Sequence, residues 1–268
     1  MKTAHHIALG ILLVTASASL LSGILAPAPY ATQFRDSPNA APSRQFPLGT
    51  DELGRDRLSR LLYGTRISLL LAPAAAFVST LLAALVGGLA GYAGGWWERA
   101  AIRSIDLFLS LPWLFLLLTV RAMLPLNVSP MASVIITFLL LGLLGWAGPA
   151  RVIRAGARAL RNADFVLQAR AGGCRGPRLL VVHVLPNLTP VLYAQFWISI
   201  PVFILSEANL GLLGLGVAEP LPSWGNLLRG LENYPAVLAN PWMLAPAVLL
   251  VLVIGCWQLV LPGEDFSS

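Results

Sequence analysis

Recognition chemistry concentrates in one segment of this chain, where seven arginines fall between positions 151 and 178. Asp164 is the only acid in that segment. A loop this rich in arginine lies on the cytoplasmic side when it separates two membrane spans. A short helix that ends near Gly172 and Gly173 would present a small basic knob there. The segment therefore predicts a site for a cytoplasmic partner.

The chain lacks the residue patterns of catalysis. A phosphate-binding loop needs a lysine after its glycine run, and the only lysine is Lys2. The HExxH, GxSxG and CxxC patterns are also missing. Cys174 and Cys256 do not have the spacing of metal ligands. We predict no catalytic residue, no metal site and no cofactor bound by this chain.

Composition indicates the setting of these residues. Of the 268 residues, 57% are hydrophobic and 11% are charged, and the mean hydropathy is +0.75. Soluble domains carry about 25% charged residues, so we predict an all-α, polytopic membrane protein. The net charge of +6 lies largely in the arginine-rich loop. Membrane topology and anionic headgroups explain it better than nucleic acid, and no nucleic-acid partner is expected.

Six apolar runs are long enough to cross about 30 Å of hydrocarbon. They are residues 7–26, 68–92, 104–125, 131–150, 187–206 and 237–261. We predict a bundle of about six transmembrane helices with a cytoplasmic coupling helix. Residues 1–66 would hold the first span and an outer amphipathic segment, and residues 67–268 a five-helix core with its loop at about 151–180. The glycine-rich second run predicts close helix packing.

The first run allows two interpretations. Lys2, the apolar stretch and the sequence APAPYA are typical of a cleaved secretory signal. The run of 19 residues from Ile7 to Leu25 is nevertheless closer to the ~20 residues of a span than to the ~7–15 of a signal core. We favour an uncleaved span. Six spans then place both termini in the cytoplasm, together with the arginine-rich loop.

The remaining polar residues refine this topology. Residues 51–62 mix both charges and predict an amphipathic helix on the outer surface. Asp106, Arg121 and Glu207 lie near span ends and can reach an interface, so no relay for a proton or sodium ion is predicted. Three prolines interrupt the fifth run, either as packing kinks or as part of a helix that lines a moving pathway. They are Pro186, Pro190 and Pro201.

Residues 164–187, DFVLQARAGGCRGPRLLVVHVLPN, resemble the cytoplasmic EAA loop of ABC-transporter permease subunits. That pattern is EAA, three residues, glycine, about nine residues, and a hydrophobic residue followed by Leu-Pro. The matching positions are Gln168, Ala169, Gly173 and the closing Val184, Leu185 and Pro186. Leu167 stands where the family has its glutamate. This departure removes a charge from the expected ATPase-docking surface.

Two further segments carry the same resemblance, in the same order along the chain. Residues 46–69, FPLGTDELGRDRLSRLLYGTRISL, resemble the segment ahead of the second span in the second, C-type permease of dipeptide, oligopeptide and nickel importers. Residues 206–228, SEANLGLLGLGVAEPLPSWGNLL, resemble that type's outer loop. The matches together cover about residues 44–230. The tail from Cys256 to Ser268 departs from the family's Gly-Asp-Gly-Leu-Arg ending.

The resemblance implies a multi-pass subunit of a bacterial inner-membrane importer. Its partners would be membrane lipid, a second permease subunit, two ATPase subunits that bind ATP and Mg, and a periplasmic or extracellular substrate-binding protein. Residues 163–176 would form the coupling helix. We expect Asp164 to cap its start and Gly173 to end it in a left-handed conformation. The expected coupling residues are Asp164, Gln168, Ala169, Arg170, Ala171, Gly173 and Arg175.

Two other function classes remain as alternatives. A secondary carrier or channel would work without an ATPase partner. A membrane enzyme acting on lipids or peptides would need a nucleophile with its base, or a metal site, and the sequence has neither pattern. The sequence does not indicate substrate-binding residues. It also leaves the cargo open among dipeptides, longer peptides, nickel chelates and other small solutes.

Overall fold

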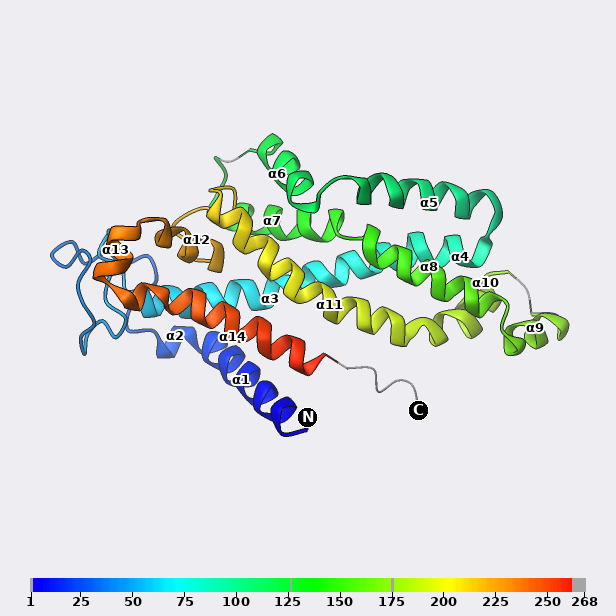
Figure 1. Cartoon of the computed structure of the whole chain (residues 1–268), viewed down its shortest axis with the longest axis horizontal. Helices are drawn as coiled ribbons and strands as arrows, with labels where there is room; N and C mark the ends of the chain where they lie inside the picture. The colour runs from blue at the N-terminus through cyan, green and yellow to red at the C-terminus, as the bar shows by residue number, and fades with distance from the viewer. Residues whose placement is uncertain (1, 126, 175, 262–268) are drawn as a thin grey trace. The chain divides into compact units, whose positions relative to one another are not determined.

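The computed structural model describes residues 2–125, 127–174 and 176–261 (Figure 1). These residues form helices, turns and one isolated β-bridge between Thr50 and Asp56. Five helical stretches are long and apolar enough to cross a membrane, and a bent helix pair makes a sixth if it counts as one span. The prediction of an all-α membrane bundle is confirmed.

The first two spans begin earlier than their apolar runs. Helix α1 covers Lys2–Leu20 and is followed by the short α2, Ser22–Leu25. The second span runs from Arg57 to Ala93 through α3 (Arg57–Ala83), the π-helical turn η1 (Ala84–Gly88) and α4 (Leu89–Ala93). It continues without a break across residues 66 and 67, the boundary predicted between the two parts of the chain.

The predicted amphipathic helix over residues 51–62 is wrong. Residues 51–56 form turns, and α3 begins directly afterwards at Arg57. The cause is a cap: the Asp56 carboxylate accepts hydrogen bonds from the Ser59 backbone N–H at 2.7 Å and from its hydroxyl at 2.6 Å. Aspartate in this position satisfies a free N–H of the first helical turn. The segment therefore starts the span and does not form a separate surface helix.

The third apolar run is broken rather than continuous. Helices α5 (Gly95–Ser110) and α6 (Trp113–Met123) are bent by 86° at the break between them. Leu111 has an extended backbone, with φ −88° and ψ 132°. Pro112 explains this conformation, because a proline disfavours helical geometry in the preceding residue and has no N–H of its own. The single span expected over residues 104–125 is thus replaced by two helices.

The remaining spans are longer than expected or shifted at their ends. Helices α7 (Pro130–Leu144) and α8 (Ala147–Arg161) form the fourth stretch, and η2 (Leu180–Val184) with α11 (Leu185–Leu212) the fifth. The prolines of the fifth run lie inside α11 without ending it. The sixth stretch comprises η4 (Pro241–Leu244) and α14 (Ala245–Val260). Short helices complete the chain: α9 (Asp164–Ala171), α10 (Pro177–Leu179), α12 (Trp224–Arg229), η3 (Gly230–Glu232) and α13 (Tyr234–Ala239).

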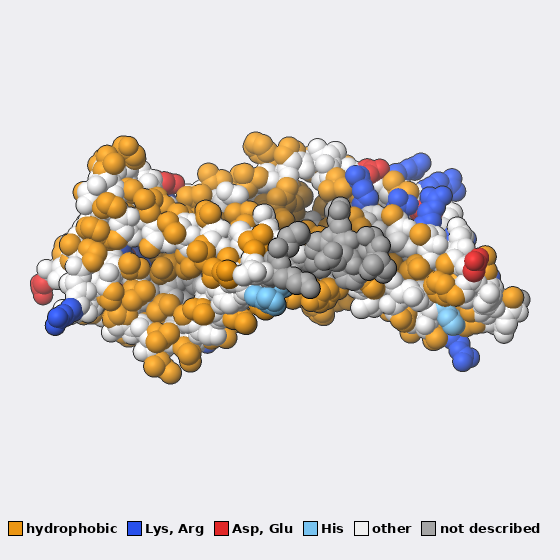
Figure 2. Space-filling model, turned by 60° about the horizontal axis from the view of Figure 1, so that its bottom comes forward, with side chains coloured by type: hydrophobic (Ala, Val, Ile, Leu, Met, Phe, Trp, Pro, Cys, Tyr) orange, Lys and Arg blue, Asp and Glu red, His pale blue; other side chains and the backbone are white. Residues whose placement is uncertain are grey.

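The chain divides into two compact units. Unit 1 comprises residues 1–72, 120–138 and 201–268, and unit 2 comprises residues 73–119 and 139–200. In unit 1, α1 packs along α14. In unit 2, α8 packs against η1, α4 and α5. Apolar side chains are spread over much of the face drawn in Figure 2. Exposed apolar side chains suit contact with bilayer hydrocarbon, where polar side chains are costly.

Candidate coupling site

Helix α8 carries the first four arginines of the predicted loop and is fixed in unit 2 by close contact with the second span. A Cβ atom added to Gly87 would lie 2.3 Å from the carbonyl oxygen of Ala150. One added to Gly91 would lie 2.4 Å from the carbonyl oxygen of Arg154. These two glycines are four residues apart and share one helix face, so the backbones touch there. The close packing predicted for the glycine-rich run is confirmed.

The arginines of α8 also pair with acids of α5. The Nη1 atom of Arg154 lies 2.6 Å from Oε1 of Glu98, and Nη1 of Arg158 lies 3.3 Å from the same oxygen. Arg151 forms an ion pair with Asp106. Glu98 and Arg154 are largely buried, with side chains 13% and 18% exposed. These arginines therefore hold α5 against α8, in addition to the topological role expected from the sequence.

Helix α9 rests on the core of unit 2 through one face. Val166 is fully buried in a cluster with residues of α8, α10, η2 and α11. The other buried members of this cluster are Ala157, Leu179, Val184 and Leu188. Ala169, one turn after Val166, packs against the same cluster. The small side chain of Ala169 thus faces the unit's own core, whereas Ala171 is exposed.

The amino end of α9 differs from expectation. The N-cap is Ala163, with an extended backbone, and no side chain among the described residues caps the helix. Asp164 is the first residue inside the helix, which places it one position too late for the predicted N-cap role. Its charge still lies at the positive end of the helix dipole. The expected cap is therefore wrong, while the preference for an acid in the first turn is met.

The carboxyl end of α9 is the left-handed end that Gly173 predicts. Gly172 is the C-cap, and Gly173 has φ +88°. The Cys174 N–H donates to the Ala169 carbonyl at 3.0 Å, and the Gly173 N–H donates to that of Arg170 at 3.1 Å. This pair of bonds is the Schellman motif. It turns the chain sharply, and the Tyr92 hydroxyl then holds the next turn by donating to the Gly176 carbonyl at 3.1 Å.

Two large apolar side chains of α9 are exposed among polar residues. Leu167 is 45% exposed and Phe165 is 39% exposed. The other exposed positions are Asp164, Gln168, Arg170 and Ala171. Phe165 is not among the coupling residues expected from the sequence, and helical spacing alone does not reveal its exposure, because it lies one turn before the core-facing Ala169. Arg175, also expected at this site, lies outside the described residues.

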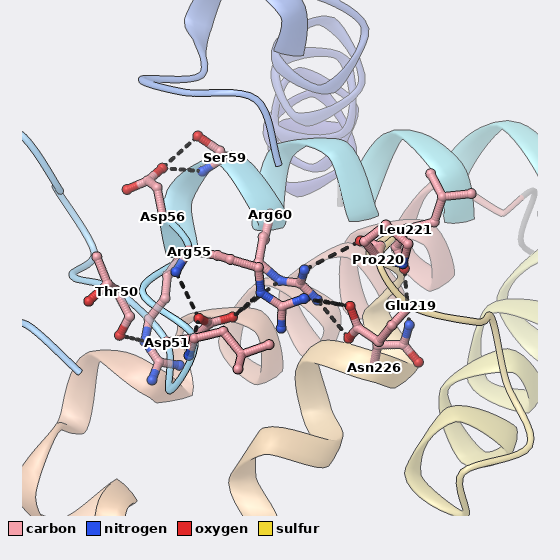
Figure 3. A network of polar contacts seen from close by, with 12 residues as sticks. Thr50, Asp51, Arg55, Asp56, Ser59, Arg60, Glu219, Pro220, Leu221 and Asn226 are labelled. Atoms are coloured by element: carbon pink, nitrogen blue, oxygen red, sulfur yellow. Dashed lines mark hydrogen bonds and ion pairs between the residues drawn. The ribbon is translucent and has the colours of Figure 1, made fainter. Parts of the chain in front are cut away.

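The other two segments that resemble the family meet each other within unit 1 (Figure 3). Glu219 accepts from Arg55 at 2.7 Å and from Arg60 at 2.9 Å. Asp51 completes the network, 2.7 Å from Nε of Arg55 and 3.8 Å from Nε of Arg60. Burial lowers the pKa of Arg55, but attraction and hydrogen bonding by Asp51 and Glu219 outweigh it and raise that pKa above its ordinary value. Asn226 holds the same loop by donating to the carbonyls of Val217 at 2.9 Å and Leu221 at 3.1 Å.

Glycines in the outer-loop motif allow its backbone to fold tightly. A Cβ added to Gly211 would lie 2.3 Å from the Cα of Gly225, and one added to Gly216 would lie 2.6 Å from the Cα of Gly211. Any side chain at these positions would collide with main-chain atoms. Trp224, fully buried beside them, donates from its indole nitrogen to the Thr65 hydroxyl at 3.1 Å.

Two ionisable residues expected at an interface are instead buried in unit 1. Glu207 is fully buried in α11, and the Ser68 hydroxyl donates to its carboxylate at 3.3 Å. Arg121 is 1% exposed, and its Nη2 donates to the Ser133 hydroxyl at 3.3 Å. Asp106 remains half-exposed, as expected. A position near a span end does not determine which side of the helix carries the residue, and here two of the three face inward.

Comparison with known proteins points to a single family. Residues 83–257 match the family model described as binding-protein-dependent transport system inner membrane component. A Brucella suis protein named as a peptide permease is 36% identical over 217 residues, 81% of this chain and 70% of that protein. The dipeptide transport system permease protein DppC of Bacillus subtilis is 30% identical over 247 residues, 91% of this chain and 75% of that protein. The oligopeptide transport system permease protein OppC of Haemophilus influenzae is 32% identical over 216 residues, 80% of this chain and 67% of that protein.

Proposed function

We propose, starting from the fact that this chain belongs to the family of binding-protein-dependent transport system inner membrane components, that it is the C-type permease subunit of an ATP-driven peptide importer. Peptides are the proposed cargo because the similar proteins are named as peptide, dipeptide and oligopeptide permeases. The chain spans the membrane several times, and with a second permease subunit it would form the translocation path.

In this proposal, two separate ATPase subunits bind ATP and Mg and drive the movement. A substrate-binding protein delivers the cargo from outside, and this chain hydrolyses no nucleotide. The arginine-rich loop lies in the cytoplasm with both termini. The orientation can be tested with a cysteine at position 170 in a chain whose native cysteines are replaced by alanine. Labelling of that cysteine only from the periplasmic side would contradict the proposal.

The observation that carries the coupling role is the two-sided character of α9. Val166 and Ala169 hold one face on the core of unit 2, while Leu167, Gln168 and Ala171 stay exposed on the other. A helix fixed on one side and open on the other can receive force from a partner and pass it to its own core. We assign this role to residues 163–176, which would dock into a groove of the ATPase.

The test is ATPase stimulation in the assembled transporter. Arg170→Glu reverses a charge on α9 and is expected to reduce stimulation several-fold, because like charges or lost pairs at an interface weaken docking. Arg103→Glu is the matched control, since Arg103 is also an exposed arginine of unit 2 but lies in α5, away from α9. Equal loss in both variants, or in neither, would contradict docking at α9. Turnover by the isolated chain in liposomes would contradict the need for a partner ATPase.

A further inference from the structure

Unit 1 contains a cavity of about 220 Å³ beside the loop that follows α11. Arg121 at the end of α6 and Ser133 in α7 form one part of its lining, and Asn226 and Arg229 of α12 form another. Loop residues 214 and 216–219 complete it. This volume far exceeds the space that one water molecule needs. The cavity can therefore accept a small chemical group together with some of its hydration.

Arg121 brings a buried and weakly bonded charge to this cavity. Its two hydrogen bonds are long, 3.3 Å from Nη2 to the Ser133 hydroxyl and 3.5 Å from Nη1 to the Pro125 carbonyl. Its Nε is buried without a hydrogen-bond partner among the described residues. A guanidinium has five N–H donors, and within the described part of the chain Arg121 makes only these two hydrogen bonds. Leaving such a group buried and unpaired is costly.

Ser133 cannot serve as the missing partner. Its hydroxyl donates to the Gly216 carbonyl at 3.3 Å and accepts from the Ala218 N–H at 3.1 Å, in addition to the bond from Arg121. These three bonds use its one proton and both lone pairs. Ser133 instead holds the loop and Arg121 in fixed positions relative to each other.

The acid in the cavity lining is already committed to other arginines. Glu219 pairs with Arg55 and Arg60, and these two arginines share Asp51 as a second acid (Figure 3). Two acids thus balance two arginines in that network. Within the described part of the chain, no carboxylate lies within 4.0 Å of Arg121.

Arg229 adds a second positive charge at the exposed side of the cavity. Its side chain is exposed, and its guanidinium lies over Gly214, where a Cβ would come within 3.3 Å of Nη1. Gly214 has φ +75° and no side chain, which leaves the guanidinium room to lie close to the loop backbone. Among the described residues, Arg229 has no ion pair either.

We propose that this cavity binds the carboxylate of a small solute. Arginine presents a planar fork of donors that matches the two oxygens of a carboxylate. Arg121 supplies the buried fork, and Arg229 supplies a second cation at the exposed side. A carboxylate here would satisfy the unused donors of Arg121 and neutralise a buried charge. The identification of the solute as a peptide, which carries a free carboxyl end, rests on the proposed function.

The experiment measures dipeptide binding to the full chain in lipid nanodiscs by calorimetry. The probes are L-alanyl-L-alanine and the same dipeptide with a carboxyl-terminal amide. The acid form is expected to bind at least about tenfold more tightly than the amide, since a hydrogen bond to a charged group contributes a factor of that order. Arg121→Gln and Arg229→Gln are each expected to weaken acid binding at least about tenfold. Arg44→Gln is the matched control, because Arg44 is an exposed arginine of unit 1 outside the cavity.

Several results would overturn the proposal. Equal binding of the acid and amide forms would show that the carboxylate is not recognised. Unchanged acid binding by Arg229→Gln would show that Arg229 does not bind the carboxylate. Because Arg229 is exposed, this variant can still be measured if Arg121→Gln does not fold. If the site instead took a carboxylate of the external binding protein, the isolated chain would bind neither dipeptide. That result also overturns the proposal.

The same measurements separate this inference from the proposed function. Dipeptide binding uses residues of unit 1, whereas ATPase stimulation is tested through Arg170 in unit 2. Intact stimulation combined with equal acid and amide binding would reject the carboxylate site alone. Carboxylate-selective binding combined with ATPase stimulation that Arg170→Glu leaves unchanged would reject the coupling role and leave the site standing.

Discussion

Gly172 and Gly173 are neighbours, but only Gly172 has a backbone conformation that readily accepts a side chain. A Cβ on Gly172 would meet only ordinary contacts at 3.5 and 3.6 Å, whereas Gly173 has φ +88°. A side chain in the left-handed region costs about 1–2 kcal/mol. In the assembled transporter, we therefore expect Gly173→Val to loosen the end of α9 and reduce ATPase stimulation, and Gly172→Ala to leave it unchanged. Identical stimulation in both variants would show that the end of α9 does not affect coupling.

Leu167 tests the chemistry of the outer face of α9. It is a large apolar side chain that is 45% exposed, so we expect it to dock against an apolar part of the ATPase. Leu167→Glu would then bury a charge at the interface and lower ATPase stimulation. Gln168→Glu, the same charge at the next exposed position, is expected to have the smaller effect. Higher stimulation in Leu167→Glu than in wild type would instead mean that the ATPase surface at this position binds a glutamate better than a leucine.

At the scale of elements, the contact between α8 and the second span is so close that it leaves no room for a methyl group at Gly87. A Cβ on Gly87 would collide with the Ala150 carbonyl oxygen at 2.3 Å, whereas one on Gly88 would meet Ile153 at 3.9 Å. We expect Gly87→Ala to destabilise unit 2 by about 1–3 kcal/mol, as overpacking does, and to lower the unfolding temperature in detergent. Gly88→Ala should leave that temperature nearly unchanged. If the two variants melt alike, the helices are not in backbone contact at this point.

The elements also show what a sequence of this kind can and cannot predict. Apolar length identified the spans, and Gly173 identified the end of α9, because both depend on local backbone chemistry. The break at Pro112 could have been predicted from the same local rules. The burial of Glu207 and Arg121 could not, because it depends on which helix face meets a distant loop. Asp164 missed the N-cap by one residue, a shift that spacing alone does not resolve.

At the scale of the whole molecule, Glu219 joins segments about 160 residues apart. It pairs with Arg60, whose side chain is 4% exposed, but its own side chain is 51% exposed. Loss of the pair between Glu219 and Arg60 should therefore lower the free energy of unfolding by about 1–2 kcal/mol, between the values for exposed and buried pairs. A double-mutant cycle of Glu219→Gln with Arg60→Gln, measured by thermal unfolding, is expected to show coupling, and Glu232→Gln serves as the exposed control. Additive effects in the cycle would mean that the pair contributes no interaction energy.

The packing of α1 along α14 has a consequence for synthesis. The Nδ1 atom of His5 lies 3.3 Å from the carbonyl oxygen of Leu259, a partner 254 positions later in the chain. Ribosomes add about 5–20 residues per second, so α1 would wait roughly 10–50 s before its neighbour is made. Only 11% of the span in α1 is buried in the completed chain, so α1 tolerates that interval among lipids. The packing of α1 against α14 therefore forms late in synthesis, and interrupted translation would leave α1 inserted but without α14.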